Sequence, residues 1–174
     1  MADDLLIATP GGRHAWSAIA TFRGRSFRAS VGRAGLTADK HEGDGASPIG
    51  VWPMRRVLFR PDRVTPKTAL PMQPLRPEDG WCNDPTHRDY NRMVRLPFDG
   101  RHEELWRKDG LYDLVVQLGY NDDPPIAGKG SAVFLHVLGP DRDATAGCLA
   151  VARDELLLML AEIGRGAAVE FRPA

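Results

Sequence analysis

Two nearly continuous apolar runs, at 111–121 and 131–139, constrain this chain most, because each has the length of a strand and ends in turn residues. Runs that are apolar on both faces are typical of strands in the middle of a sheet. An alternating pair of segments at 14–22 and 26–32, joined by a short turn at 23–25, predicts a β-hairpin. We therefore expect a fold organised around a β-sheet.

Three more segments have the pattern of strands. Residues 148–152 and 167–171 are short apolar stretches in the second half of the chain. A longer stretch covers 51–59, and Pro53 lies inside it. Because proline has no backbone N–H to donate, we expect this strand at a sheet edge or at a β-bulge.

Two segments have helical features. Residues 102–110 end in a glycine that predicts a helix stop, and residues 154–164 combine an amphipathic pattern with acids in the first turn and a final glycine. No internal repeat or low-complexity tail occurs in the 174 residues. We therefore predict a single domain over 1–174 that is mainly β, with a few short helices.

A proline-rich segment at 61–77 contains five prolines and has neither a helical nor a strand period. Such a segment is extended and comparatively stiff, and it cannot join the interior of a sheet. Two interpretations stay open. The segment is either a surface excursion or a rigid wall beside a cleft, since long irregular stretches inside compact domains are often functional.

The composition excludes several classes of function. Lysine plus arginine and aspartate plus glutamate each number 23, so no excess of positive charge predicts a nucleic-acid partner. The only cysteines, Cys82 and Cys148, are too few for a metal site, and neither a CxxC pair nor an HExxH helix accompanies them. We expect no metal and no cofactor. A disulfide between the two cysteines is an alternative that would silence both thiols.

The N-terminal residues do not have the pattern of a signal peptide. Two acids stand where a basic region is expected, and the apolar run at 5–8 is too short. No other run approaches the length that spans a membrane. We expect a monomer without membrane insertion and without a visible export signal.

One histidine and one cysteine flank a polar loop near the end of the chain. Strand alternation places His136 on the same face as Phe134, and Cys148 follows a glycine, Gly147, at a predicted sharp turn. Alone, a strand histidine or a buried cysteine is more often a packing residue. Together they predict a nucleophile and its base, with Thr145 adding a hydroxyl. A nearby imidazole lowers a thiol pKa, so we expect the pKa of Cys148 to be below the reference of about 8.5.

These residues, with an earlier Ser47-Pro48-Ile49-Gly50 element, resemble the YkuD-type L,D-transpeptidase family. Its members carry an early [ST]-P-x-G element, a strand histidine and a [ST]-x-G-C turn, which here are residues 47–50, His136 and residues 145–148. The resemblance implies a β-sandwich catalytic domain with Cys148 as nucleophile and His136 as base. Backbone N–H groups around Gly147 and Cys148 would stabilise the oxyanion, and a backbone carbonyl or hydroxyl would orient the histidine. The order of histidine before cysteine also argues against papain-like peptidases.

The reaction that the resemblance implies is acyl transfer on peptidoglycan stem peptides and muropeptides. The cysteine attacks the carbonyl of an L-residue, expels the following D-residue, and holds a thioester until an amine of diaminopimelate resolves it. Such a substrate implies a periplasmic protein. Two alternatives stay open: a hydrolase in which water resolves the thioester, and a non-catalytic wall-binding module.

Two substitutions within the motif point to a branch of the family. The usual turn is S-H-G-C-[IV]-R, whereas this chain has Ala146 in place of the second histidine and Ala150 in place of the arginine. With the short loop before Cys148 and the proline-rich segment 61–77, the chain resembles a proteobacterial subgroup that forms 1,3-crosslinks. Such enzymes join L-alanine of one stem to diaminopimelate of another, and a 3,3-crosslinking activity is the alternative.

Four residues in turn-rich segments are candidate substrate contacts, either by stacking on a sugar or by lining a peptide groove: Trp81, Tyr90, Tyr120 and Asn121. For each of them a packing or turn-forming role is the alternative. We interpret Cys82 as structural, because no glycine precedes it.

Overall fold

The computed structural model describes residues 4–141 and 143–174, and most of its strands form one nine-stranded sheet. The order of the strands in this sheet is β11-β12-β13-β3-β2-β1-β14-β6-β7. Their bounds are β1 Leu5–Pro10, β2 Ser17–Phe22, β3 Arg25–Ser30, β6 Gly50–Phe59, β7 Met72–Pro74, β11 Leu114–Leu118, β12 Phe134–Val137, β13 Leu149–Val151 and β14 Ala168–Phe171. The prediction of a mainly β protein is confirmed.

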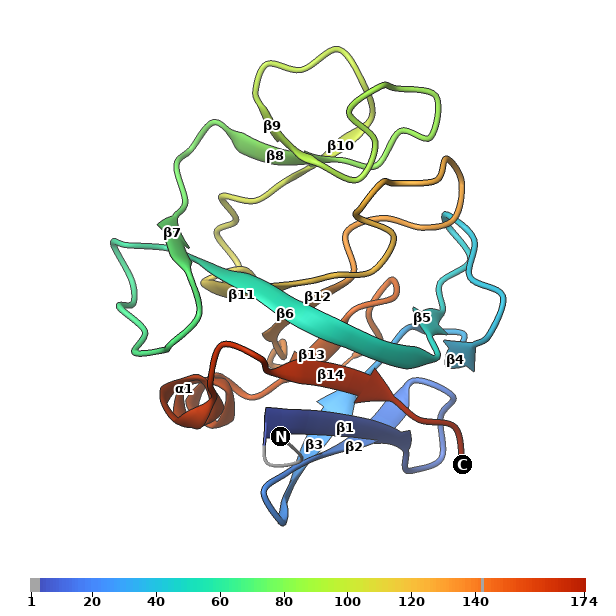
Figure 1. Cartoon of the computed structure of the whole chain (residues 1–174), viewed down its shortest axis with the longest axis vertical. Coiled ribbons are helices and arrows are strands. Elements are labelled where there is room, and N and C mark those ends of the chain that lie inside the picture. The colour runs from blue at the N-terminus through green and yellow to red at the C-terminus, as the bar shows by residue number, and fades with distance from the viewer. Residues whose placement is uncertain (1–3, 142) are drawn as a thin grey trace.

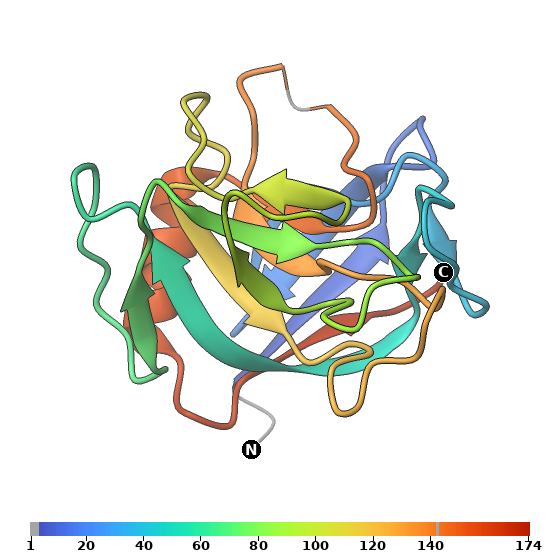
Figure 2. The same ribbon diagram turned by 90° about the horizontal axis from the view of Figure 1, so that it is seen from above.

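The sheet closes on itself, because β6 pairs with β11 as well as with β14. Figure 1 shows β6 and β11 in one layer and β1, β2 and β3 in the opposite layer, and Figure 2 shows the strands curving around the space between them. The two layers enclose a core of 27 buried residues, with α1 (Arg153–Glu162) packed at one end. Burial of this apolar surface is the main stabilising contribution to such a fold.

The two runs that predicted central strands do lie in the sheet interior, as β11 and β12. Residues of one face, such as Val116 and Leu135, pack in the main core, whereas Val115 and Phe134 pack in a second cluster on the other face. A three-stranded sheet, β8 (Asp79–Cys82), β9 (Met93–Arg95) and β10 (His102–Glu104), covers that second cluster. Coverage on both faces explains why these strands are apolar throughout.

The hairpin and the long proline-containing strand were predicted with different success. The hairpin is confirmed, as β2 and β3 pair in antiparallel register. β6 is not an edge strand, because it has partners on both sides. Pro53 lies where the pairing with β14 ends and that with β11 begins, and Arg55 of β6 is left unpaired at a register shift two residues later, as the alternative of a β-bulge predicted. The missing N–H is tolerated at this change of partners.

The prediction of a helix at 102–110 is wrong. Residues His102–Glu104 form β10, which pairs antiparallel with β8 so that Glu103 lies opposite Trp81. Long-range pairing has overridden a weak local helical preference. The other predicted helix is confirmed as α1, the only α-helix in the described part of the chain. No helix of this part is long and apolar enough to cross a membrane.

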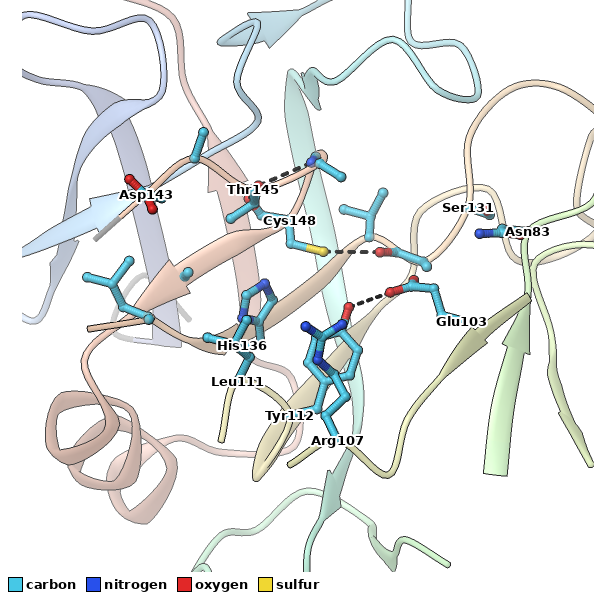
Figure 3. A pocket seen from close by; sticks show the side chains of 18 of the residues that line it. Asn83, Glu103, Arg107, Leu111, Tyr112, Ser131, His136, Asp143, Thr145 and Cys148 are labelled. Atoms are coloured by element: carbon cyan, nitrogen blue, oxygen red, sulfur yellow. Dashed lines mark hydrogen bonds between the residues drawn. The ribbon is translucent and has the colours of Figure 1, made fainter. Parts of the chain in front are cut away.

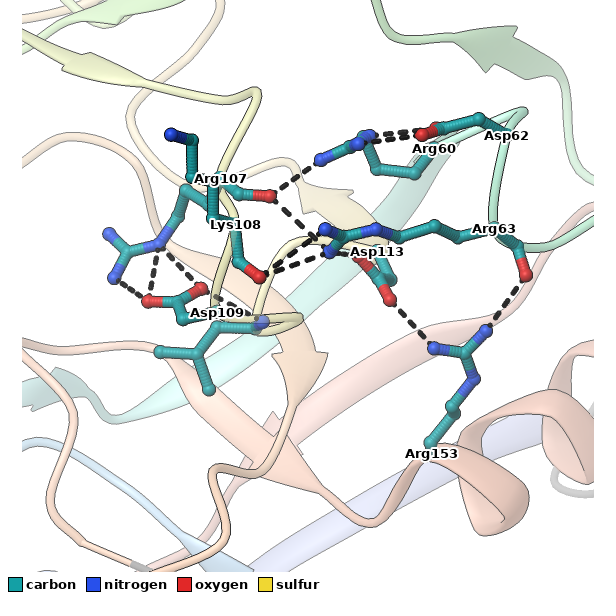
Figure 4. A network of polar contacts seen from close by, with 9 residues as sticks. Arg60, Asp62, Arg63, Arg107, Lys108, Asp109, Asp113 and Arg153 are labelled. Atoms are coloured by element: carbon teal, nitrogen blue, oxygen red, sulfur yellow. Dashed lines mark hydrogen bonds and ion pairs between the residues drawn. The ribbon is translucent and has the colours of Figure 1, made fainter.

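The proline-rich segment 61–77 runs along an edge of the structure. Three of its residues form β7, which pairs with β6 at the end of the sheet, and Leu75 packs in the second cluster. A buried carboxylate, Asp113, anchors the start of the segment through ion pairs of 3.0 Å to Arg63 and 2.7 Å to Arg153 of α1 (Figure 4). Asp113 therefore binds arginines of the same chain, because a buried carboxylate requires such partners.

The same network holds the loop that follows β10. Arg60 donates to the backbone carbonyl of Arg107 at 2.6 Å, and Arg63 donates to that of Lys108 at 3.3 Å (Figure 4). Arg60 is itself buried and pairs with Asp62 at 2.7 Å. Charge-assisted hydrogen bonds from a fixed guanidinium hold these carbonyls in place, so the loop around Arg107 is fixed from behind.

Candidate active site

A cavity of about 850 Å³ opens between the small sheet and the ends of β12 and β13. Cys148 and His136 both line it, as do Gly147 and Thr145, so the structure brings the four residues predicted as catalytic to one place. Figure 3 shows His136 and Cys148 together on one wall and Glu103 with Tyr112 on the neighbouring wall. None of the described residues that line the cavity comes from the proline-rich segment 61–77.

The turn before Cys148 requires a glycine. Gly147 has φ of +144°, a region that other residues rarely adopt, and a Cβ there would lie 2.8 Å from the Ala46 carbonyl oxygen. The backbone at Gly147 therefore packs directly against the Ala46 carbonyl, with no room for a side chain between them. This approach places Cys148 directly before β13, on the cavity side of the sheet.

Two hydroxyls brace the turn. Ser47, which is fully buried, accepts a hydrogen bond from Gly32 N–H at 2.9 Å and donates one to the Gly147 carbonyl at 2.7 Å. Thr145 donates to the Cys148 carbonyl at 2.7 Å and accepts from Gly147 N–H at 3.1 Å. The Gly147 amide is thus already engaged, whereas the Cys148 amide has no acceptor among residues 4–141 and 143–174. Ser47, the serine of the early sequence motif, therefore braces the turn through Gly147, which lies 100 residues later in the chain.

The histidine is held by a backbone carbonyl, as the family resemblance implied. His136 Nδ1 lies 2.9 Å from the Val137 carbonyl oxygen. A carbonyl only accepts hydrogen bonds, so Nδ1 carries the proton and, in the neutral ring, Nε2 has the free lone pair. The Tyr112 ring packs edge-on against the imidazole at 5.3 Å between centroids. His136 therefore presents an unprotonated nitrogen as a proton acceptor.

The prediction of a low thiol pKa is not supported by the environment of Cys148. Burial raises the pKa of this thiol to about 12, and burial lowers the pKa of His136 to about 4. The thiol donates to the Ala132 carbonyl at 3.2 Å, and no described hydrogen bond joins it to the imidazole. The resting pair is therefore a neutral thiol and a neutral imidazole, because burial disfavours both charged forms.

Polar groups from the loop after β10 form the neighbouring wall. Tyr112 donates its hydroxyl proton to Glu103 at 2.6 Å. The Arg107 guanidinium lies over the Tyr112 ring at 5.1 Å and pairs with Asp109. Lys40 also lines the cavity, near Gly147, and its ammonium is bound by Asp44 at 2.6 Å. None of Glu103, Arg107 and Tyr112 was predicted as a site residue, because 102–110 has the pattern of a helix and Tyr112 begins an apolar run.

The four predicted substrate contacts do not line the cavity. Trp81 is buried and donates to Asn91 Oδ1 at 2.9 Å, while the Tyr90 hydroxyl accepts from Gly130 N–H at 3.0 Å. Tyr120 donates to the Lys129 carbonyl at 2.6 Å, and Asn121 makes three hydrogen bonds within its own loop. All four side chains make hydrogen bonds within the fold, and contact of any of them with substrate stays a prediction.

Both cysteines are free and buried, so the alternative of a disulfide is wrong. Cys82 lies in β8 and lines no part of the cavity. Among residues 4–141 and 143–174, no group of three or more His, Cys, Asp and Glu side chains is arranged to hold a metal ion.

Comparison with known proteins gives one result. A family model described as YkuD, L,D-transpeptidase catalytic domain, matches residues 11–170, which include every residue of the cavity wall. No curated protein and no solved structure matches the chain.

Proposed function

The chain belongs to the YkuD family of L,D-transpeptidase catalytic domains, and on this basis we propose that it crosslinks peptidoglycan stem peptides through a thioester on Cys148. The observation that carries the proposal is the cavity in which Cys148 and His136 lie on one wall, with the histidine tautomer set by the Val137 carbonyl. The family acts on the cell wall, so we place the protein in the periplasm.

In the first step, acylation, the proton of the Cys148 thiol passes to His136 Nε2 as Sγ attacks the carbonyl of an L-residue. The Cys148 N–H, free of other acceptors among the described residues, stabilises the oxyanion that forms. His136 then returns the proton to the departing amine, the C–N bond breaks, and a thioester remains. Because both groups are neutral at rest, the proton moves together with the attack and no preformed thiolate is needed.

In the second step, an acceptor amine attacks the thioester carbonyl, the C–S bond breaks, and Cys148 regains its proton. Only 7% of Cys148 is exposed, so bulk water has limited access to the thioester at this stage. A crosslink between two stem peptides is the product.

We propose 1,3-crosslinking as the specificity, in which the L-alanine carbonyl is attacked and D-glutamate departs. Ala146 and Ala150 leave the turn without the charged groups of the usual family motif. The expelled residue carries a carboxylate next to its amine, so a cation is still needed close by. We propose Arg107, on the loop after β10, as the cation that binds this carboxylate. Its Nε and Nη2 bind Asp109, whereas its Nη1 has no partner among the described residues.

Incubation with defined muropeptides tests the function. We expect dimers whose masses and fragments place the new bond between L-alanine and diaminopimelate. Cys148→Ala should abolish them, whereas Cys82→Ala, at a cysteine outside the cavity, should retain them when folded. Dimers through the third residue of both stems would indicate 3,3-crosslinking, shortened monomers would indicate a hydrolase, and intact substrate would contradict an enzymatic function.

A further inference from the structure

Glu103 is a carboxylate placed opposite the nucleophile by the small sheet. It lies in β10, paired with Trp81 of β8, and strand alternation points it into the cavity while Glu104 is exposed on the other side. Its only side-chain hydrogen bond among the described residues joins Oε1 to the Tyr112 hydroxyl at 2.6 Å. The Tyr112 ring in turn contacts His136. One oxygen of Glu103 is therefore anchored and the other is available to a ligand.

In the transfer reaction the acceptor ammonium loses two protons, and His136 accepts only one of them. An aliphatic amine is an ammonium ion at neutral pH and has no lone pair until it loses one proton. The amine must lose a second proton after it attacks, because the product is a neutral amide. His136 Nε2 accepts one proton on its way to the departing sulfur, so another group must take the first.

We propose that Glu103 binds the acceptor ammonium in the cavity and removes its first proton, which makes it the general base of the transfer step. This inference rests on the proposed function and assigns the acceptor side of the same site. The ammonium N–H bond breaks toward the free oxygen of Glu103, and the amine lone pair then forms the C–N bond at the thioester carbonyl. The second proton passes through His136 to the Cys148 sulfur as the C–S bond breaks, and Glu103 releases its proton to solvent.

Four other acids line the cavity, and two of them, Asp141 and Asp143, are exposed on the loop between β12 and β13. Asp109 is paired with Arg107 through three hydrogen bonds, and Glu42 accepts from the Ser131 hydroxyl. Glu103, which is neither exposed nor hydrogen-bonded to an arginine, makes one hydrogen bond, to the Tyr112 phenol. Figure 3 shows its carboxylate beside the Tyr112 hydroxyl, on the wall next to His136 and Cys148.

The surroundings of Glu103 make its carboxylate a stronger base than an exposed one. Burial raises the pKa of Glu103, and the negative charge of Glu42 adds to that direction. The Tyr112 hydroxyl and the positive charge of Arg107 oppose it. A carboxylate with a raised pKa accepts a proton from an ammonium more readily than an exposed one.

The test compares Glu103→Gln with Glu104→Gln, a matched change at the adjacent exposed residue of β10. Two quantities are measured: the formation of the Cys148 acyl-enzyme by intact mass, and the rate of transfer to two nucleophiles. One nucleophile is a diaminopimelate-containing stem peptide, and the other is hydroxylamine, which is largely unprotonated at neutral pH. We expect Glu103→Gln to acylate like the wild type and to transfer to the stem amine about 100-fold more slowly, which is the lower range for loss of a general base. Transfer to hydroxylamine should be unchanged.

Three outcomes would overturn the inference. Glu103→Gln could transfer normally to the stem amine, or lose transfer to both nucleophiles equally, as a structural role predicts. Glu104→Gln could show the same selective loss. A wild-type protein that forms no acyl-enzyme would instead refute the proposed function itself, which this design distinguishes by its first measurement.

Discussion

Replacing Ser47 by alanine tests how the active-site turn is held. The hydroxyl is fully buried and joins two backbone groups, Gly32 N–H at 2.9 Å and the Gly147 carbonyl at 2.7 Å. Removal of the hydroxyl leaves both without a partner, and an unsatisfied buried polar group costs about 1 to 3 kcal/mol. For two groups, with partial relaxation of the backbone, we expect Ser47→Ala to lower the free energy of unfolding by about 2 to 4 kcal/mol. In a protein of this size that corresponds to a decrease in Tm of roughly 4 to 16 °C.

Urea denaturation and thermal melting measure this loss, and the rate of Cys148 acylation shows whether the turn has moved. Ser26→Ala is the control, because its hydroxyl shares only an exposed hydrogen bond with Thr21, and it should change stability by less than about 0.5 kcal/mol. If Ser47→Ala were as stable as the Ser26→Ala control, with an unchanged urea m value, Ser47 would not brace the turn.

Two more predictions concern the nucleophile. Gly147→Ala should lower the free energy of unfolding by about 2 kcal/mol or more and abolish acylation, because it combines backbone strain at φ +144° with a Cβ 2.8 Å from the Ala46 oxygen. Gly166→Ala, with open space around the glycine, is its control in urea denaturation, and equal stability of the two variants would contradict the strain. Burial raises the pKa of the Cys148 thiol, so the protonated form persists to higher pH than in a free cysteine. Iodoacetamide labelling of Cys148, followed by peptide mass, should therefore show no inflection at or below about pH 8.5, whereas an inflection near neutral pH would indicate a thiolate and imidazolium pair.

The central strands, the strand face of His136 and the glycine turn before Cys148 were predictable from local sequence patterns. β11 and β12 are apolar on both faces because each face packs in a separate cluster, so the sequence reads as a continuous apolar run. Strand alternation correctly placed His136 away from the core face that carries Leu135. The glycine before Cys148 also signalled its turn, because only glycine tolerates the backbone conformation found there.

The second wall of the cavity was decided by tertiary structure. Residues 102–110 have a helical composition, but pairing with β8 makes the first three of them a strand, which turns Glu103 toward the cavity. The loop that follows carries Arg107, and Arg60, from a distant segment, holds its carbonyl. No local pattern encodes which distant strand supplies such partners, and weak helix propensity yields to them.

The charge state of Cys148 depends on the tertiary structure and not on the local sequence. The sequence by itself determined the central strands β11 and β12, that Cys148 follows a tight glycine turn, and that His136 belongs to a strand face with cavity access, because these depend on side-chain periodicity and on backbone conformation. It suggested a low thiol pKa from the presence of an imidazole. The tertiary structure reversed that expectation, because it buries both groups and because no charged side chain of residues 4–141 and 143–174 forms a hydrogen bond with the thiol. Desolvation is a property of the assembled cavity, to which segments from the whole chain contribute, and so only the folded protein sets it.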